Sequence, residues 1–100
     1  MTGIVDYGAG NLRSVQKALE YLGERAVVSD SAEILDGCER LILPGVGAFG
    51  QGMSALNAKG LADYLLRRVA DTPLLGICLG MQFLMRRSFE DGEHAGLGLC

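Results

Sequence analysis

Gly76-Ile77-Cys78-Leu79-Gly80 is the stretch that decides the fold. It follows an apolar run that begins at Leu74, and it precedes Phe83 and Leu84 at helical spacing. This pattern predicts a strand that passes directly into a helix, with the thiol of Cys78 at the turn between them. The glycines two residues either side of the cysteine allow the close approach of strand and helix that such a turn requires.

Outward from this turn, apolar runs alternate with segments of helical period along most of the chain. Leu41-Ile42-Leu43 is apolar at every position, as expected of a strand covered on both faces. The alternation predicts an α/β fold with a doubly wound, mostly parallel sheet and helices on both faces. The expected strands cover residues 4–5, 26–28, 41–43 and 74–77, and the expected helices cover residues 12–22, 32–35, 49–56, 61–69 and 79–84.

The two ends of the chain carry different signals. Asn11 is a plausible N-cap for the first helix, and Gly23 is placed to end it. Residues 88–100 are rich in glycine and charge and read as a loop. Within that stretch Leu97, Leu99 and Cys100 predict the beginning of a further strand.

The composition is that of one small globular domain. The chain has 100 residues, of which 49% are hydrophobic, and a formal net charge of −3 with Lys and Arg scattered. Nucleic-acid binding is disfavoured because no basic stripe is present to hold a phosphate backbone. No run of about 18 apolar residues occurs, so no membrane span is expected, and neither a metal nor a cofactor is predicted. Three cysteines without a secretory signal suggest reduced thiols and a cytoplasmic location.

Cys78 is the candidate nucleophile. Unpaired N–H groups at a helix N-terminus favour the thiolate over the thiol. The N–H of Leu79, directly after the cysteine, is expected to be free to donate to the oxyanion that forms when sulfur attacks a carbonyl carbon. The alternative is that Cys78 is a small buried hydrophobic residue, since free cysteine is among the most buried residue types.

Pro44-Gly45-Val46-Gly47 follows another predicted strand. In open parallel sheets, ligands bind beyond the carboxyl ends of the strands, which is also where Cys78 is expected. A glycine-flanked peptide there can turn its N–H inward as a second donor to the oxyanion. The alternative is an ordinary strand-to-helix loop.

Together the two motifs are more specific than either alone, and they resemble the class I, or triad, glutamine amidotransferases. The resemblance extends through Met81-Gln82. The opening stretch from Asp6 to Val15, with residues 47–50 and Met53, narrows it to the glutaminase subunits of imidazole glycerol phosphate synthases. The resemblance covers essentially all of the chain. It implies a flavodoxin-like sheet, incomplete here, with residues 1–100 as the N-terminal half of a single amidotransferase domain.

What the resemblance implies about chemistry is specific. In that family glutamine is hydrolysed to glutamate and ammonia, and the ammonia passes to a barrel-shaped synthase (cyclase) subunit that makes imidazole glycerol phosphate in histidine biosynthesis. Carried over, Cys78 forms a glutamyl thioester, and the N–H groups of Leu79 and of Gly45, Val46 and Gly47 form the oxyanion hole. Gln82 helps to hold the substrate glutamine; a polar residue on an exposed helix face is its alternative.

The resemblance also implies a partner interface. Gly8, Gly10 and Asn11 match a glycine-rich loop that the family presents to its synthase subunit. A helix cap is the simpler role for Asn11, and the two roles are compatible. A dinucleotide-binding turn is a weak alternative because Arg13 stands where the third glycine would be.

The acid–base half of the expected triad is missing from these residues. The family takes a His and a Glu from a downstream His-Pro-Glu context, whereas His94, the only histidine here, lies in a glycine-rich, charged stretch and is expected to be exposed and not catalytic. The chain by itself is therefore expected to be inactive or nearly so. Alternatives are the glutaminase of another amidotransferase and a truncated, non-catalytic partner-binding protein. A cysteine hydrolase of similar fold is disfavoured, because its histidine usually follows the nucleophile, where Leu79 stands.

Overall fold

The computed structural model describes residues 1–8, 11–90 and 92–99. Its centre is a four-stranded sheet in the order β2-β1-β3-β4, in which every pairing is parallel. The predicted parallel sheet is therefore confirmed. The strands are β1 (Thr2–Val5), β2 (Ala26–Ser29), β3 (Arg40–Leu43) and β4 (Leu74–Gly76).

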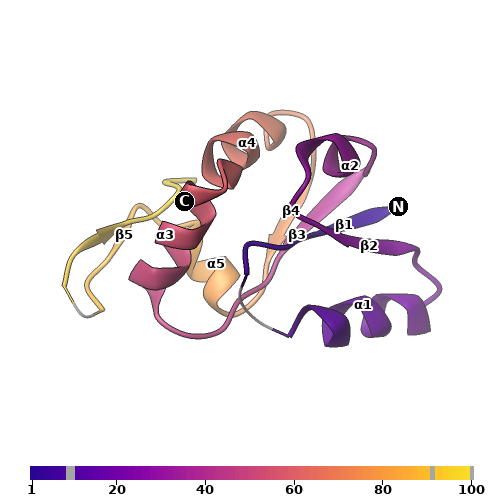
Figure 1. Cartoon of the computed structure of the whole chain (residues 1–100), viewed down its shortest axis with the longest axis horizontal. Helices are drawn as coiled ribbons and strands as arrows, with labels where there is room; N and C mark the ends of the chain where they lie inside the picture. Colours follow the sequence, from indigo (N-terminus) through magenta and orange to yellow (C-terminus); the bar gives the residue numbers. More distant parts are fainter. Residues whose placement is uncertain (9–10, 91, 100) are drawn as a thin grey trace.

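Helices alternate with these strands along the chain (Figure 1). The first begins as its cap signal predicts, because the side-chain oxygen of Asn11 accepts a hydrogen bond of 3.4 Å from the N–H of Ser14. The helices are α1 (Leu12–Tyr21), α2 (Ala32–Asp36), α3 (Phe49–Ala58), α4 (Leu61–Arg68) and α5 (Leu79–Phe83). In Figure 1, α1 lies on one side of the sheet, away from the other four helices.

The two faces of the sheet are covered unequally. Val5, Leu41 and Leu43 point into a core shared with buried side chains from α2, α3, α4 and α5. The opposite face carries α1, which contacts β1 and β2. Beside α1, over β3 and β4, lies an apolar groove lined by Ser14, Val15, Ala18, Leu19, Leu22, Ile42, Leu75 and Ile77. The side chain of Leu75 in this groove is 57% exposed, so the sheet has a largely uncovered apolar surface here.

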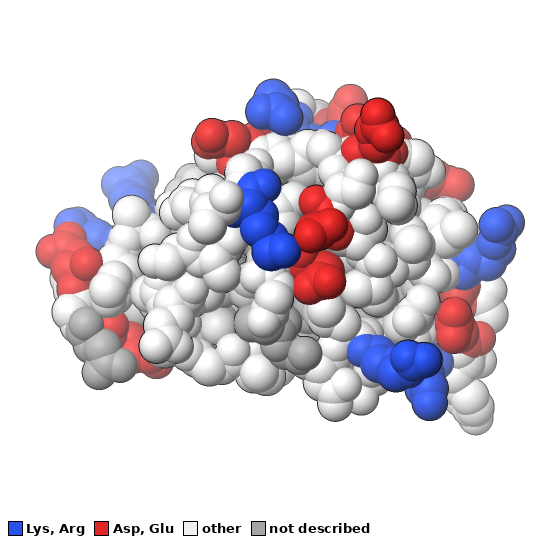
Figure 2. Space-filling model, viewed as in Figure 1, with Lys and Arg blue, Asp and Glu red and all other residues white. Residues whose placement is uncertain are grey.

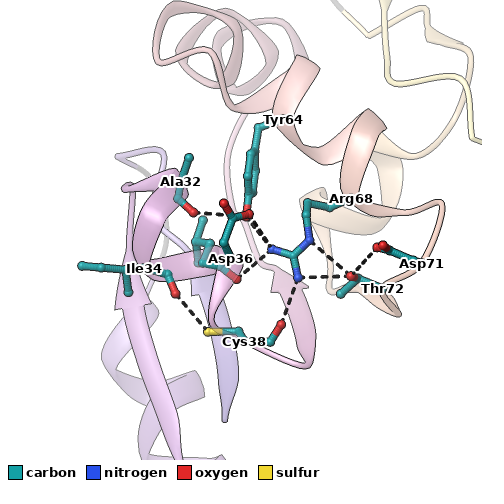
Figure 3. Close-up of polar contacts among 9 residues, drawn as sticks. Ala32, Ile34, Asp36, Cys38, Tyr64, Arg68, Asp71 and Thr72 are labelled. Carbon is teal, nitrogen blue, oxygen red and sulfur yellow. Dashed lines mark hydrogen bonds and ion pairs between the residues drawn. The ribbon is translucent and has the colours of Figure 1, made fainter.

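A polar cluster joins α4 to α2 and to the loop before β3 (Figure 3). The guanidinium group of Arg68 donates to the carbonyls of Leu35 (2.8 Å) and Cys38 (2.9 Å) and pairs with the carboxylate of Asp36. The hydroxyl of Tyr64 donates to the same carboxylate at 2.8 Å. Because the bonded carbonyls belong to the end of α2 and its following loop, this cluster fixes α4 to α2 and to the loop that leads into β3.

The C-terminal residues differ from the prediction. Arg87–Ser88 and His94–Ala95 form a short antiparallel hairpin, β5 and β6, where a loop was expected. Leu97 and Leu99 are not in a strand, which corrects the prediction of one, and Cys100 lies outside the described residues. The reason is the choice of partner: the N–H groups of Leu97 and Leu99 donate to the carbonyls of Phe83 and Leu84 at the end of α5, not to a neighbouring strand.

Candidate active site at the carboxyl edge of the sheet

Three loops meet at one edge of the sheet. Because β1, β3 and β4 run parallel, their carboxyl ends deliver Tyr7, the Pro44–Gly47 segment and Cys78 to the same edge. The strand order places β2 on one side of β1 and β3 on the other, so the chain reverses its direction of winding beside β1. Ligands of open α/β sheets bind at such switch points.

Cys78 occupies the turn that the sequence predicted, between the end of β4 and the start of α5. Its backbone has φ 54° and ψ −119°, and it is the one non-glycine residue with positive φ among those described. Such a conformation is unfavourable for an L-residue and is found at functional sites. The side chain is exposed, whereas Cys38 is buried. The alternative of a buried structural cysteine is therefore excluded for Cys78.

The glycines on either side of Cys78 are required by the packing. A Cβ atom on Gly80 would lie 1.6 Å from the carbonyl oxygen of Leu43, so α5 begins in direct contact with the backbone of β3. A Cβ atom on Gly76 would lie 2.6 Å from the α carbon of Met81. Both contacts are with backbone, which cannot move aside as a flexible side chain can. The expected close approach of strand and helix is confirmed.

The expected oxyanion donor is already engaged. The N–H of Leu79 donates a 3.1 Å hydrogen bond to the carbonyl oxygen of Gly45, which corrects the expectation that this N–H is free. The reason is proximity: α5 starts so close to the end of β3 that the Pro44–Gly47 segment reaches the first turn of the helix. Within that segment Gly45 is buried, Val46 and Gly47 are exposed, and Gly47 has φ 103°.

Tyr7 lies at the same edge of the sheet, although its only signal in the sequence was its place within the stretch from Asp6 to Val15. Its side chain is buried, and its hydroxyl donates a 2.7 Å hydrogen bond to the carbonyl of Pro44. Burial raises the pKa of this hydroxyl to about 12. Its ring meets that of Phe83 edge-on, with centroids 5.6 Å apart. The periodicity of the sequence could not predict this hydrogen bond, because it joins residues that are 37 positions apart.

The other predicted site residues are placed as follows. Gln82 is exposed on α5, one turn after Cys78, and its N–H donates to the carbonyl of Cys78 at 3.3 Å. Gly8 is exposed with φ 96°, and its N–H donates to the carboxylate of Asp6 at 3.0 Å. Asn11 is exposed and caps α1, as described above. Gly10, the third member of the predicted interface, lies outside the described residues.

The C-terminal hairpin packs against the start of α3. The carboxylate of Glu90 accepts a 3.0 Å hydrogen bond from the N–H of Phe49, the first residue of α3. The imidazole of His94 lies against Gly50, where a Cβ atom would be 2.7 Å from a ring carbon. His94 is therefore half-buried, which corrects the expectation of an exposed loop histidine.

This geometry can be compared with that of known proteins. A model of the family described as "Glutamine amidotransferase class-I" matches residues 3–91. The chain belongs to the class I glutamine amidotransferase family. A solved chain described as "Crystal structure of glutamine amidotransferase" superposes with a TM-score of 0.80 at 26% identity, over 98% of this chain and 52% of the solved one.

Relatives of this amidotransferase chain carry the description "Imidazole glycerol phosphate synthase subunit HisH". The protein from Chlorobium luteolum is 54% identical over 99% of this chain and 50% of its own length. Those from Exiguobacterium sibiricum and Geobacillus thermodenitrificans are 46% and 55% identical, over 99% of this chain and 51% and 47% of their own lengths. The amidotransferase chain thus spans about half the length of the relatives it matches.

The structure of this amidotransferase chain adds three further observations. On the face drawn in Figure 2, Lys and Arg side chains are interspersed with Asp and Glu. Among the described residues, no cluster of His, Cys, Asp and Glu has the arrangement of a metal site. Within residues 1–8, 11–90 and 92–99, no helix combines the length and the apolar character that crossing a membrane requires.

Proposed function

We propose that this chain supplies the nucleophile half of a glutaminase, the subunit of imidazole glycerol phosphate synthase that hydrolyses glutamine to glutamate and ammonia. The observation that carries the proposal is the exposed thiol of Cys78 on a strained turn, adjacent to the glycine-rich Pro44–Gly47 segment. The identity of about half the residues to the synthase relatives supports this assignment over other amidotransferases.

The proposed reaction begins with attack by the Cys78 thiolate on the side-chain amide carbon of glutamine. A carbon–sulfur bond forms, and the carbonyl electrons move to oxygen to give a tetrahedral oxyanion. When these electrons return, the carbon–nitrogen bond breaks, and the nitrogen leaves as ammonia with the proton that a general base had taken from the Cys78 thiol. Water then attacks the thioester carbon, which releases glutamate and restores the thiol of Cys78. The proton acceptor is expected from the part of the relatives that these residues do not cover.

In this proposal the oxyanion is bound by backbone N–H groups from Leu79 and from the Gly45-Val46-Gly47 stretch. The N–H of Leu79 becomes available only when the Gly45 carbonyl moves away from it, because that carbonyl accepts its hydrogen bond in the present structure. The resting arrangement therefore has its first donor blocked. Gln82, exposed one turn after the nucleophile, is proposed to contact the bound glutamine.

We assign the loop at Gly8, Gly10 and Asn11 to the interface with a cyclase barrel subunit, which receives the ammonia. The exposure of Gly8 and Asn11 at the same edge of the sheet as Cys78 supports this assignment. A cytoplasmic location is proposed with it, in keeping with unpaired thiols at Cys38 and Cys78.

We propose that residues 1–100 are the N-terminal half of one domain and that the other half covers the apolar groove between α1 and strands β3 and β4. The exposure of Leu75 in that groove, together with the coverage of only half of each relative, supports this. A dye that fluoresces on apolar surfaces should bind these 100 residues and should lose that binding when the chain is extended to the relatives' length. Equal binding by both chains would contradict it.

The activity is tested by measuring glutamate release from glutamine, using the chain extended to the length of its relatives and mixed with a cyclase subunit. Turnover that is abolished by Cys78→Ser and retained in Cys38→Ser supports the proposal. The 100-residue chain alone should show little or no turnover. If Cys78→Ser were as active as the parent protein, the proposed reaction would be wrong.

A further inference from the structure

The contact between Tyr7 and Pro44 connects two loops of the site directly. The Tyr7 hydroxyl lies 2.7 Å from the Pro44 carbonyl oxygen, and a Cβ atom on Gly45 would lie only 2.0 Å from the same hydroxyl. The hydroxyl therefore occupies the space that a side chain at position 45 would need. The buried tyrosine is thus the reason why position 45 requires glycine.

The position of this hydroxyl is fixed by its surroundings. The ring of Tyr7 is 1% exposed and packs edge-on against Phe83, at an interplanar angle of 74°. Phe83 in turn packs against Phe49, with centroids 5.5 Å apart. Phe83 ends α5, which begins directly after Cys78. Phe49 begins α3 and is separated from the Pro44–Gly47 segment by one residue, Ala48. The same aromatic cluster therefore holds the nucleophile's helix, the segment opposite it and Tyr7.

The hydrogen bonds continue from Tyr7 to the nucleophile. The Tyr7 hydroxyl donates to the carbonyl of Pro44. The carbonyl of the next residue, Gly45, accepts a hydrogen bond from the N–H of Leu79, which directly follows Cys78. Of these two bonds, only the second must break for Leu79 to donate to a substrate oxygen. The first can persist, because it is buried and involves neither Leu79 nor Cys78.

We infer that Tyr7 is a positioning residue for the proposed glutaminase reaction. Its hydroxyl holds the Pro44–Gly45 peptide in place, so that the rest of the Pro44–Gly47 segment can rearrange about a fixed end. This inference rests on the proposed function. Tyr7 does not touch the substrate in it. Its effect is on the geometry of the donors, and a displacement of about 1 Å in such groups costs on the order of 100-fold in rate.

The test compares Tyr7→Phe with Tyr64→Phe in the extended protein with its cyclase subunit. Both changes remove one hydroxyl from a buried ring, but Tyr64 bonds to Asp36 in the polar cluster around Arg68, which contains none of the site residues. We expect Tyr7→Phe to lower kcat for glutamine hydrolysis by about 10- to 100-fold with KM changed less than about threefold, since donor geometry and not glutamine binding is affected. Tyr64→Phe should retain the kcat of the parent protein.

Two results would overturn the inference: a Tyr7→Phe kcat within about twofold of the parent, or equal kcat losses in both variants in step with their losses of stability. Absence of turnover in the parent protein would instead reject the proposed function.

Should Tyr7→Phe fail to fold, a measurement on the parent protein tests the inference instead. With proline carbonyls and backbone nitrogens isotopically labelled, the Pro44 carbonyl signal should move less than the Leu79 amide signal when Cys78 is alkylated by 6-diazo-5-oxo-norleucine. A larger shift at Pro44 would contradict a fixed end.

Discussion

A Cβ atom on Gly80 would lie 1.6 Å from the carbonyl oxygen of Leu43, so the first turn of α5 touches the backbone of β3 with no room for a side chain. This contact determines where the helix after Cys78 can start. It also explains why the nucleophile's turn has glycine at this position, since every other residue type carries a Cβ.

Gly80→Ala is therefore expected to force α5 away from β3. The free energy of unfolding should fall by about 3 kcal/mol or more, because the clash is with backbone. Gly37→Ala is the matched control: its nearest contact would be at 3.5 Å and its φ is −77°, so its stability should stay within about 0.5 kcal/mol of the parent. Urea unfolding measures both. Equal, small effects would mean that strand and helix are not in contact here.

The backbone of Cys78 provides a second prediction. Its φ of 54° is strained for a residue with a Cβ atom, and glycine relieves that strain. Cys78→Gly should therefore be more stable than Cys78→Ala by about 1 kcal/mol, after allowance for the greater chain entropy of glycine in the unfolded state. Both variants lack the thiol, so the comparison isolates the backbone. A Cys78→Ala protein as stable as Cys78→Gly would show that the turn is unstrained.

The sequence predicted those features of the fold and the site that depend on neighbouring residues, and it did not predict those that depend on contacts between distant residues. The parallel strands and the Cys78 turn follow from local patterns: the apolar run at residues 41–43 and the glycines at positions 76 and 80. The bond from Tyr7 to Pro44 and the one from Leu79 to Gly45 could not be predicted, because each joins segments far apart in the chain. The hairpin at residues 87–95 was missed because its strands have two residues each, too few to show alternation.

The Arg68 cluster predicts a large stability effect away from the site. Arg68→Ala would leave the carbonyls of Leu35 and Cys38 without their donor and Asp36 without its cation, and should lower the free energy of unfolding by about 2 to 4 kcal/mol. Arg67→Ala, at the exposed neighbouring position, should cost less than about 0.5 kcal/mol. Thermal and urea unfolding test this pair. Similar losses in both would contradict the cluster's role in fixing α4.

Tyr7 also predicts how stability varies at alkaline pH. Burial raises the pKa of its hydroxyl from 10.0 to about 12, so the folded state keeps the proton that the unfolded chain loses. This contribution is fully present below pH 10 and is lost as the pH rises toward 12, by about 3 kcal/mol in total. In Tyr7→Phe the decline should be smaller by this amount. Tyr21→Phe, which alters a 91% exposed ring, should leave the decline unchanged. An identical decline in the parent and Tyr7→Phe would refute the assignment.

The proposed reaction requires that the sulfur of Cys78 attacks glutamine. The direct measurement is mass spectrometry of the extended protein, mixed with a cyclase subunit and treated with the glutamine-analogue electrophile 6-diazo-5-oxo-norleucine. We predict one adduct, on the peptide containing Cys78, that excess glutamine suppresses and that is absent from Cys78→Ser, while buried Cys38 stays unmodified. An unmodified Cys78, or labelling that glutamine does not suppress, would contradict the account.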